Sequence, residues 1–154
     1  MKTLFLITIF TFVGIAAHAQ QPKVVEFINP SEWPKPPGYT HVVKVSGGTT
    51  IYLSGQVPTD AQGQIVGKND FDAQARQVFE NLQTALKAAG ATFADVVKMN
   101  TYVVGLTIER RNRIREIRRN YLNMEQPPAS TLAGVEALYD PEVLIEIEAI
   151  AVIK

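Results

Sequence analysis

An alternating pattern of side chains stands out near the C-terminal end of the chain. As a β-strand, residues 144–153 would place isoleucines and alanines on one face, and two glutamates, a leucine, an isoleucine and a valine on the other. Both faces are largely apolar, which is typical of a strand covered on both sides. A carboxylate on such a strand needs a partner or a wet cleft. Glu146 and Glu148 are therefore the first candidate functional residues.

Two other stretches have the spacing of α-helices. Apolar side chains recur at intervals of three and four over residues 70–89, with Asn69 or Asp70 as the capping residue and a glycine at the end. A second helix is predicted over residues 109–122. Its inner side would consist of Ile114, Ile117 and Tyr121.

The remaining strands are predicted from alternation and from turn residues. They cover residues 24–28, 39–45, 50–56, 96–104 and 131–135, the first of them at a sheet edge. Ser46-Gly47-Gly48 is expected to close a hairpin between the second and third strands. Asp140–Pro141 is the turn signal between the last two strands, which are expected to form another pair.

This order of strands and helices predicts a layered α+β domain with two helices on one face of a mixed sheet. The other sheet face would then be bare. Because its apolar residues need a cover, we expect a homo-oligomer.

Composition narrows the classes of function. The chain has 154 residues, enough for one domain with a core, and a formal net charge of zero, so no bulk field recruits nucleic acid or an anionic membrane. It has no cysteine, which excludes disulfides, thiol catalysis and cysteine-ligated metal. Neither a metal-spaced histidine pair nor a nucleotide-binding glycine loop occurs. We therefore expect no metal and no cofactor.

The first residues have the features of a secretory signal peptide. A lysine precedes an apolar run at residues 4–17, and Ala17-His18-Ala19 matches the small-x-small cleavage pattern. Residues 1–19 are therefore predicted to be removed, leaving 20–154 as a single domain, periplasmic or secreted and without a membrane segment after cleavage. An uncleaved anchor is the alternative.

Six arginines lie between residues 110 and 119 on the second predicted helix. Such a cluster could neutralise phosphates, which would suggest nucleic acid as a partner. No aromatic side chains for base stacking are interleaved with it. We interpret the arginines as a solvated outer helix face, and nucleic acid is not expected as a partner.

Several short motifs carry a family resemblance. They are SGQVP at residues 54–58, QARQVFENL at 74–82, AAG at 88–90, DVVK at 95–98, Pro128-Ala129 and IEIEAIA at 145–151. On these motifs the chain resembles the Rid (YjgF-like, reactive intermediate deaminase) family over about residues 29–153. The resemblance implies a chorismate-mutase-like α+β fold. It also implies a homotrimer whose sheets face a central barrel, with ligand clefts between subunits.

The resemblance also implies an activity and residues for it. Deaminating members hydrolyse short-lived enamines and imines such as 2-aminoacrylate to a keto acid and ammonia, with no cofactor or metal. A glutamate at the position of Glu146 orients the attacking water, and Tyr39 matches a tyrosine that lines the cleft. The family's carboxylate-binding arginine follows the Pro-Ala pair, where this chain has Ser130 and then Thr131.

The change from arginine to serine alters what the site can bind. A guanidinium grips a carboxylate through two charged hydrogen bonds, whereas a hydroxyl offers one neutral bond. The charged bond contributes roughly 1.5–3 kcal/mol and the neutral one about 1 kcal/mol. A substrate that is neutral or differently charged is therefore expected in place of 2-aminoacrylate.

Two functions from different classes remain open. The first is an imine or enamine hydrolase with Glu146 as its catalytic residue and a labile C–N metabolite as substrate. The alternative is a non-catalytic trimeric protein that binds a small metabolite. In both, Tyr39, Ser130 and Thr131 would provide hydrogen bonds to the ligand. RNA cleavage is a third option, supported only by the arginine-rich helix.

Overall fold

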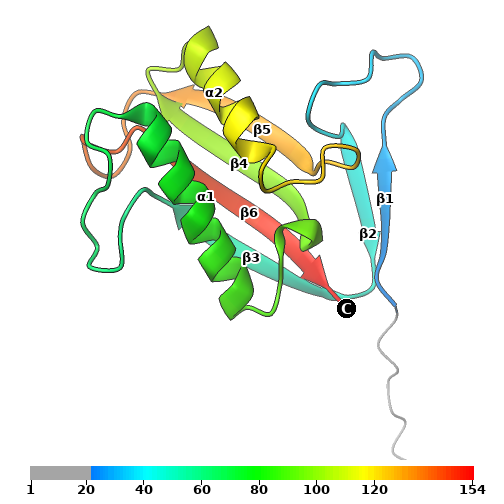
Figure 1. Ribbon diagram of the computed structural model, residues 1–154. Helices are drawn as coiled ribbons and strands as arrows, with labels where there is room; N and C mark the ends of the chain where they lie inside the picture. Colours follow the sequence, from blue (N-terminus) through cyan, green and yellow to red (C-terminus); the bar gives the residue numbers. More distant parts are fainter. Residues whose placement is uncertain (1–21) are drawn as a thin grey trace, which may run out of the picture.

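The computed structural model describes residues 22–154 (Figure 1). The predicted signal peptide lies outside these residues. In chain order the elements are β1 (Val24–Ile28), β2 (Val42–Ser46), β3 (Thr49–Gln56), α1 (Phe71–Ala88), the 3₁₀ turn η1 (Phe93–Asp95), β4 (Val96–Val104), α2 (Ile108–Arg118), β5 (Ala129–Val135) and β6 (Ile145–Ile153).

The main sheet has four strands in the order β3-β6-β4-β5. β6 is antiparallel to both β3 and β4, whereas β5 runs parallel to β4. Both helices cover the same face of this sheet (Figure 1). The predicted α+β architecture, a mixed sheet with two helices on one face, is therefore confirmed.

Helix α1 forms where its capping and periodicity predict it. The Asp70 side chain accepts a hydrogen bond from the Ala73 backbone N–H at 3.1 Å, which satisfies one of the free donors at the helix start. The buried stripe of α1 packs on the sheet and consists of Gln74, Ala75, Val78, Phe79, Leu82 and Leu86. Helix α2 is shorter than predicted and is capped by Thr107, whose hydroxyl accepts from Arg110 N–H.

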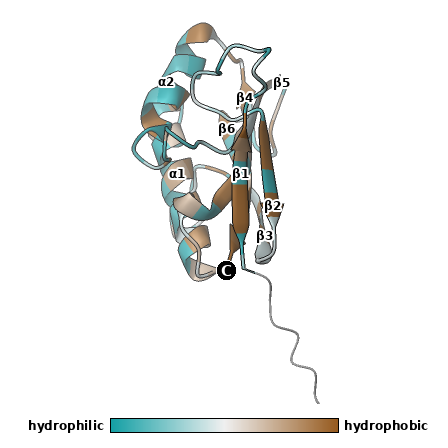
Figure 2. Cartoon of the chain, turned by 90° about the vertical axis from the view of Figure 1, so that its right-hand side faces the viewer, coloured by the Kyte–Doolittle hydropathy of each residue, from teal (hydrophilic) through white to brown (hydrophobic). Residues whose placement is uncertain are grey.

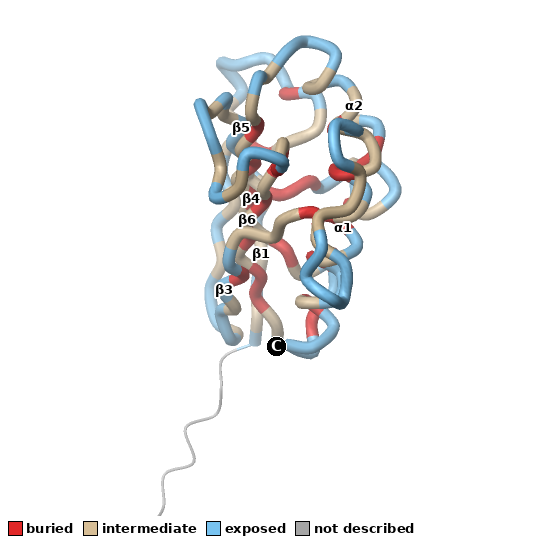
Figure 3. The backbone as a smooth tube through the Cα atoms, turned by 90° about the vertical axis from the view of Figure 1, so that its left-hand side faces the viewer, coloured by how far each residue is buried: buried red, intermediate tan, exposed pale blue. Residues whose placement is uncertain are grey.

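The hydrophobic core lies between the helices and the sheet. Figure 3 shows buried segments concentrated in β4, β6 and the inner side of the helical layer. Ile145, Ile147 and Ala151 are fully buried on this face of β6. The opposite face of the sheet has no such cover within residues 22–154, and Tyr52 there is 78% exposed. The predicted bare face is thus present.

Both predicted hairpins are wrong. β2 pairs with β1 in a separate two-stranded ribbon, and β3 pairs with β6. Gly47 and Gly48 have positive φ angles of 68° and 79°, so the chain turns from one sheet into the other. The ribbon stands beside the main sheet with largely hydrophobic strands (Figure 2), and Val24 and Val42 are about half exposed, at 50% and 48%.

The last two strands are likewise not partners, because β4 lies between β5 and β6. The connection that contains Asp140–Pro141 therefore leads from β5 past β4 to β6 and does not join two adjacent strands. Neither helix of residues 22–154 is long and apolar enough to cross a membrane.

Candidate functional site

Tyr39 is held beside the start of β5 by the residue that follows it. Thr40 is buried, and its hydroxyl donates a hydrogen bond to the Pro127 carbonyl at 2.6 Å. The Thr40 backbone N–H donates to the Pro128 carbonyl at 3.2 Å. These bonds join the proline-rich loop to the strand that carries Ser130. The resemblance had singled out Tyr39 and Ser130, and the fold brings them together.

A hollow of about 250 Å³ lies between this loop, the edge strand β5 and helix α2. Tyr39, Thr101 and Ser130 give it three hydroxyl groups, and Leu132 and Ile114 contribute apolar surface. Arg111, Arg115 and Arg118 of α2 also line it. It is therefore a small, positively charged hollow with hydroxyl groups on its walls.

Arg118 corrects the prediction that all the helix arginines face solvent. Its Nε and Nη2 atoms are shielded from solvent and have no hydrogen-bond partner within residues 22–154. Burial, and to a lesser degree repulsion from Arg115, lowers the pKa of Arg118 to about 10. The guanidinium therefore remains charged at neutral pH.

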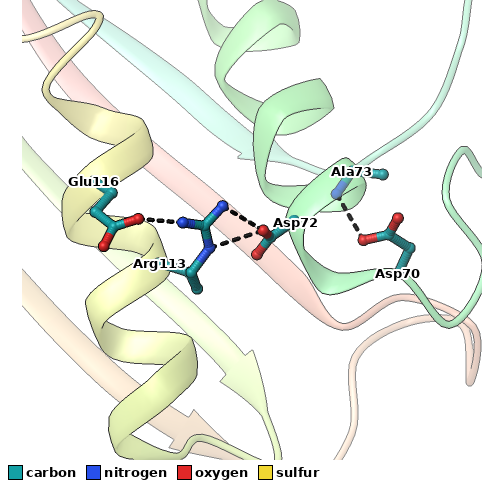
Figure 4. A network of polar contacts seen from close by, with 5 residues as sticks. All are labelled: Asp70, Asp72, Ala73, Arg113 and Glu116. Atoms are coloured by element: carbon teal, nitrogen blue, oxygen red, sulfur yellow. Dashed lines mark hydrogen bonds and ion pairs between the residues drawn. The ribbon is translucent and has the colours of Figure 1, made fainter.

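Arg113, on the same helix, shows how a partnered arginine is accommodated. Its guanidinium binds Asp72 of α1 through two nitrogens, with Nε 2.7 Å from the carboxylate, and it also pairs with Glu116 (Figure 4). The hydrogen bond from Arg113 lowers the pKa of Asp72. This pair joins the two helices, whereas Arg118 has no such carboxylate partner within residues 22–154.

Glu146 lies on the opposite face of the sheet from Ser130. Along β6 its neighbours Ile145 and Ile147 face the helices, so the Glu146 side chain faces away from them. Its carboxylate lies over Gly55 of β3, where an added Cβ would be 1.7 Å from the Glu146 oxygen. Within residues 22–154 the carboxylate has no hydrogen-bond or ion-pair partner. Glycine at position 55 leaves the space that Glu146 occupies.

Thr131 also belongs to the uncovered face. It is opposite Asn100 in the register of β4 and β5, and its hydroxyl accepts a hydrogen bond from Lys98 Nζ at 2.7 Å. The four predicted site residues therefore divide into two pairs within one chain. Tyr39 and Ser130 line the hollow beside α2, while Thr131 and Glu146 lie on the uncovered face.

Glu148 has partners, unlike Glu146. Its carboxylate accepts a hydrogen bond from Asn100 Nδ2 at 2.6 Å and one from the Tyr102 hydroxyl at 3.0 Å. The bond to Glu148 raises the pKa of Tyr102. A second hollow, of about 220 Å³, lies beside this network and is lined in part by Tyr52, Ser54 and Lys98. Two hydrogen bonds thus hold the Glu148 carboxylate in place, whereas the Glu146 carboxylate has no such partner within residues 22–154.

No group of three or more histidines, aspartates and glutamates within residues 22–154 is placed to hold a metal ion. His41 packs edge-on between two rings of the proline-rich loop, 4.9 Å from Trp33 and 5.3 Å from Tyr39, measured between ring centroids. Of these three rings, Tyr39 lines the hollow that contains Ser130.

Comparison with known proteins agrees with the fold. The family described as Endoribonuclease L-PSP matches residues 33–153. The Rid family protein YyfB of Yersinia pestis, whose function is unknown, is 38% identical, with a TM-score of 0.76 over 84% of this chain and 98% of its own.

Two other relatives are named for a reaction or a ligand. A 2-iminobutanoate/2-iminopropanoate deaminase of Dermatophagoides farinae is 30% identical over 79% of this chain and 91% of its own length. The structure of Escherichia coli TdcF with bound serine is 30% identical, with a TM-score of 0.60 over 79% of this chain and 90% of its own. The chain belongs to the YjgF/Rid/RutC family, the family of the Endoribonuclease L-PSP domain.

Proposed function

We propose that the protein hydrolyses the C=N bond of a small, labile imine, or of the imine that an enamine forms by tautomerisation, without a cofactor. The observation that carries the proposal is the Glu146 carboxylate, which is held over Gly55 with no partner among residues 22–154. A related protein named as a 2-iminobutanoate/2-iminopropanoate deaminase supports the reaction class.

The chemistry needs one group that can take up and return a proton. Water attacks the imine carbon as Glu146 takes a proton from it, and the oxygen–carbon bond forms while the C=N π bond breaks. The nitrogen takes up this proton, which gives a carbinolamine. A second proton then passes from the carbinolamine hydroxyl through Glu146 to the nitrogen, the C–N single bond breaks, and ammonia leaves as the carbonyl forms. An unpaired carboxylate suits this role because no other bond has to be broken before it binds water.

Two further parts of the proposal concern the assembly and its location. A homotrimer would cover the sheet face on which Tyr52 is exposed, and it would bring a second chain to Glu146. Removal of residues 1–19 would release the domain into the periplasm or the medium. Analytical ultracentrifugation and N-terminal sequencing of the exported protein test these two points.

Turnover of freshly generated imines tests the function directly. The panel contains 2-iminopropionate, 2-iminobutyrate and uncharged imines, and ammonia release is compared with the spontaneous rate. Glu146→Gln should lose the enzymatic component, and Glu136→Gln, which changes an exposed glutamate, should retain it. Equal rates with and without wild-type protein across the panel would contradict the proposal. Ligand binding without turnover would instead favour a non-catalytic metabolite-binding protein.

A further inference from the structure

The regular pairing of β3 with β6 is interrupted beside Glu146. Between Leu53 and Gln56, β3 has one residue more than the stretch of β6 with which it pairs. Such a bulge disrupts the ladder locally and can redirect a side chain. It contains Gly55, over which the Glu146 carboxylate lies. The ladder ends at Ile147, so the place of the carboxylate depends on how the two chain segments are held beyond that point.

Gln74 of α1 holds the segment that leads into β6. Its side chain is fully buried. Nε2 donates hydrogen bonds to the Glu142 carbonyl at 2.7 Å and to the Gly67 carbonyl at 3.3 Å, and Oε1 accepts from the Leu144 backbone N–H at 2.8 Å. The side-chain amide therefore pairs with a backbone C=O and an N–H of one segment, as the backbone of a neighbouring strand would. Glu146 follows two residues later.

Asn81 holds the segment that leaves β3. It follows Gln74 by seven residues, about two helical turns, and so lies on the same side of α1. Its Nδ2 donates hydrogen bonds to the Val57 carbonyl at 2.8 Å and to the Thr59 carbonyl at 2.9 Å. Its Oδ1 accepts from Gln77 Nε2 at 3.0 Å, which fixes the orientation of the amide. One helix thus carries both amides.

We propose that Gln74 and Asn81 are positioning residues for hydrolysis, whose amides set the place of the Glu146 carboxylate over Gly55 from the opposite, helix-covered face of the sheet (Figure 1). This inference rests on the proposed function. A general base acts only within hydrogen-bond reach of the water, and a displacement of about 1 Å can slow the reaction by about a hundredfold. Neither amide lines the hollow beside α2, so substrate binding should change less than the chemical step.

Turnover of the imine that the wild type hydrolyses fastest is measured with Gln74→Met and Asn81→Leu, which are similar in size and lack the amide. We expect kcat to fall by about tenfold to a hundredfold, and KM to change by less than about twofold. Gln83→Met, at an exposed position of α1, should retain the wild-type kcat. Leu86→Ala opens a cavity near the end of α1; it should lower the urea midpoint and retain kcat.

Gln74→Glu gives a pH profile that separates the hydrogen bonds from packing. Glutamate has the shape of glutamine, but its carboxylate cannot donate to the Glu142 carbonyl. Its protonated carboxyl can donate there and still accept from the Leu144 N–H. Burial raises the pKa of such a carboxyl. Relative to wild type at each pH, kcat of Gln74→Glu should therefore rise as the pH falls from about 9 to about 6, and kcat of Gln74→Met should not. Circular dichroism confirms that both variants are folded across this range.

A measurement without turnover separates this inference from the proposed function. In protein labelled with ¹³C at the glutamate carboxyl groups, the Glu146 resonance is assigned by its loss in Glu146→Gln. Gln74→Met should shift this resonance, whereas Leu86→Ala should not, and the resonance of the exposed Glu136 should stay in place in both variants. Absence of turnover in the wild type would contradict the proposed function, and the carbon shift would then decide the role of Gln74.

Three results would overturn the inference. The first is a wild-type kcat in folded Gln74→Met and Asn81→Leu. The second is a loss of kcat in Leu86→Ala as large as in Gln74→Met at a similar urea midpoint, which would show that both act only through stability. The third is an unchanged Glu146 carbon shift in Gln74→Met, together with no recovery of Gln74→Glu at lower pH.

Discussion

Replacing Arg118 by methionine is expected to stabilise the protein when no ligand is present. Methionine has a similar length and no charge, so it fills the same space without leaving N–H groups unpaired. Removal of a buried charge that has no partner usually raises stability, provided that the replacement packs well.

The magnitude follows from the pKa of Arg118. An exposed arginine has a pKa of at least about 12, and in the folded chain burial and Arg115 lower it to about 10. At about 1.36 kcal/mol per pH unit, the charged form is disfavoured by roughly 3 kcal/mol. The last turn of a helix attracts a positive charge with about 0.3–1 kcal/mol, which the variant loses. We expect a net gain of roughly 2 kcal/mol.

Urea unfolding at fixed protein concentration measures this gain. With a slope of about 1–3 kcal/mol per molar urea, Arg118→Met should shift the midpoint upward by about 1 M at pH 8. Arg119→Met is the control, because its side chain is exposed and adjacent, and it should change stability by less than about 0.5 kcal/mol.

The pH dependence of the stability difference between wild type and Arg118→Met is a second, independent test of the prediction. Above pH 10 the folded wild type releases the Arg118 proton while the unfolded chain still holds it, so wild-type stability rises relative to the variant. The difference in free energy of unfolding between the two proteins should therefore have its full value at pH 8 and a smaller value at pH 11. A variant that is less stable than wild type at pH 8, or a gap that does not change with pH, would refute the reasoning.

Three further changes test other parts of the structure. Gly55→Ala places a Cβ where the Glu146 carboxylate lies, so ammonia release from 2-iminopropionate should fall by at least about tenfold while the urea midpoint changes little. Arg113→Ala removes a half-exposed ion pair with Asp72 and should lower the free energy of unfolding by less than about 1 kcal/mol, as measured by urea unfolding. Because the pair lowers the pKa of Asp72, the extra stability of the wild type should be present above about pH 4 and lost at more acidic pH. Thr40→Val breaks a buried hydrogen bond to the chain before β5 and should cost about 1–2 kcal/mol, as measured by urea unfolding.

Elements with a long, regular pattern could be predicted from the sequence, and their pairing could not. Helix α1 has a cap, an unbroken stripe and a glycine at its end, and strand β4 was predicted with the bounds that it has. The pairing errors have a different cause. A glycine pair after β2 predicts a turn, but turn residues do not specify whether the next strand continues the same sheet. β3 pairs with β6, and the paired residues Leu53 and Ala149 are 96 positions apart in the chain.

The candidate site shows the same limit at the level of single side chains. Consecutive residues of a strand face opposite ways, so Ser130 and Thr131 could not serve one hollow within a chain. Gly55 was a usable signal, since a glycine inside a strand often marks a close approach by another group. Arg118 gave no signal, because its burial depends on the proline-rich loop that Thr40 ties to β5.

The position of Arg118 also changes what can be inferred from Ser130 about the charge of the substrate. A serine at the position where the resemblance implies an arginine suggests a neutral substrate only if no other cation reaches the same hollow. Here Ser130 and Arg118 line one hollow from opposite sides, the strand and the helix, and no carboxylate is present to separate two guanidinium groups. An arginine at position 130 would face Arg118 and Arg115 with like charge. A hydroxyl on the strand and a guanidinium on the helix are therefore compatible, and a serine at position 130 does not by itself exclude anion recognition.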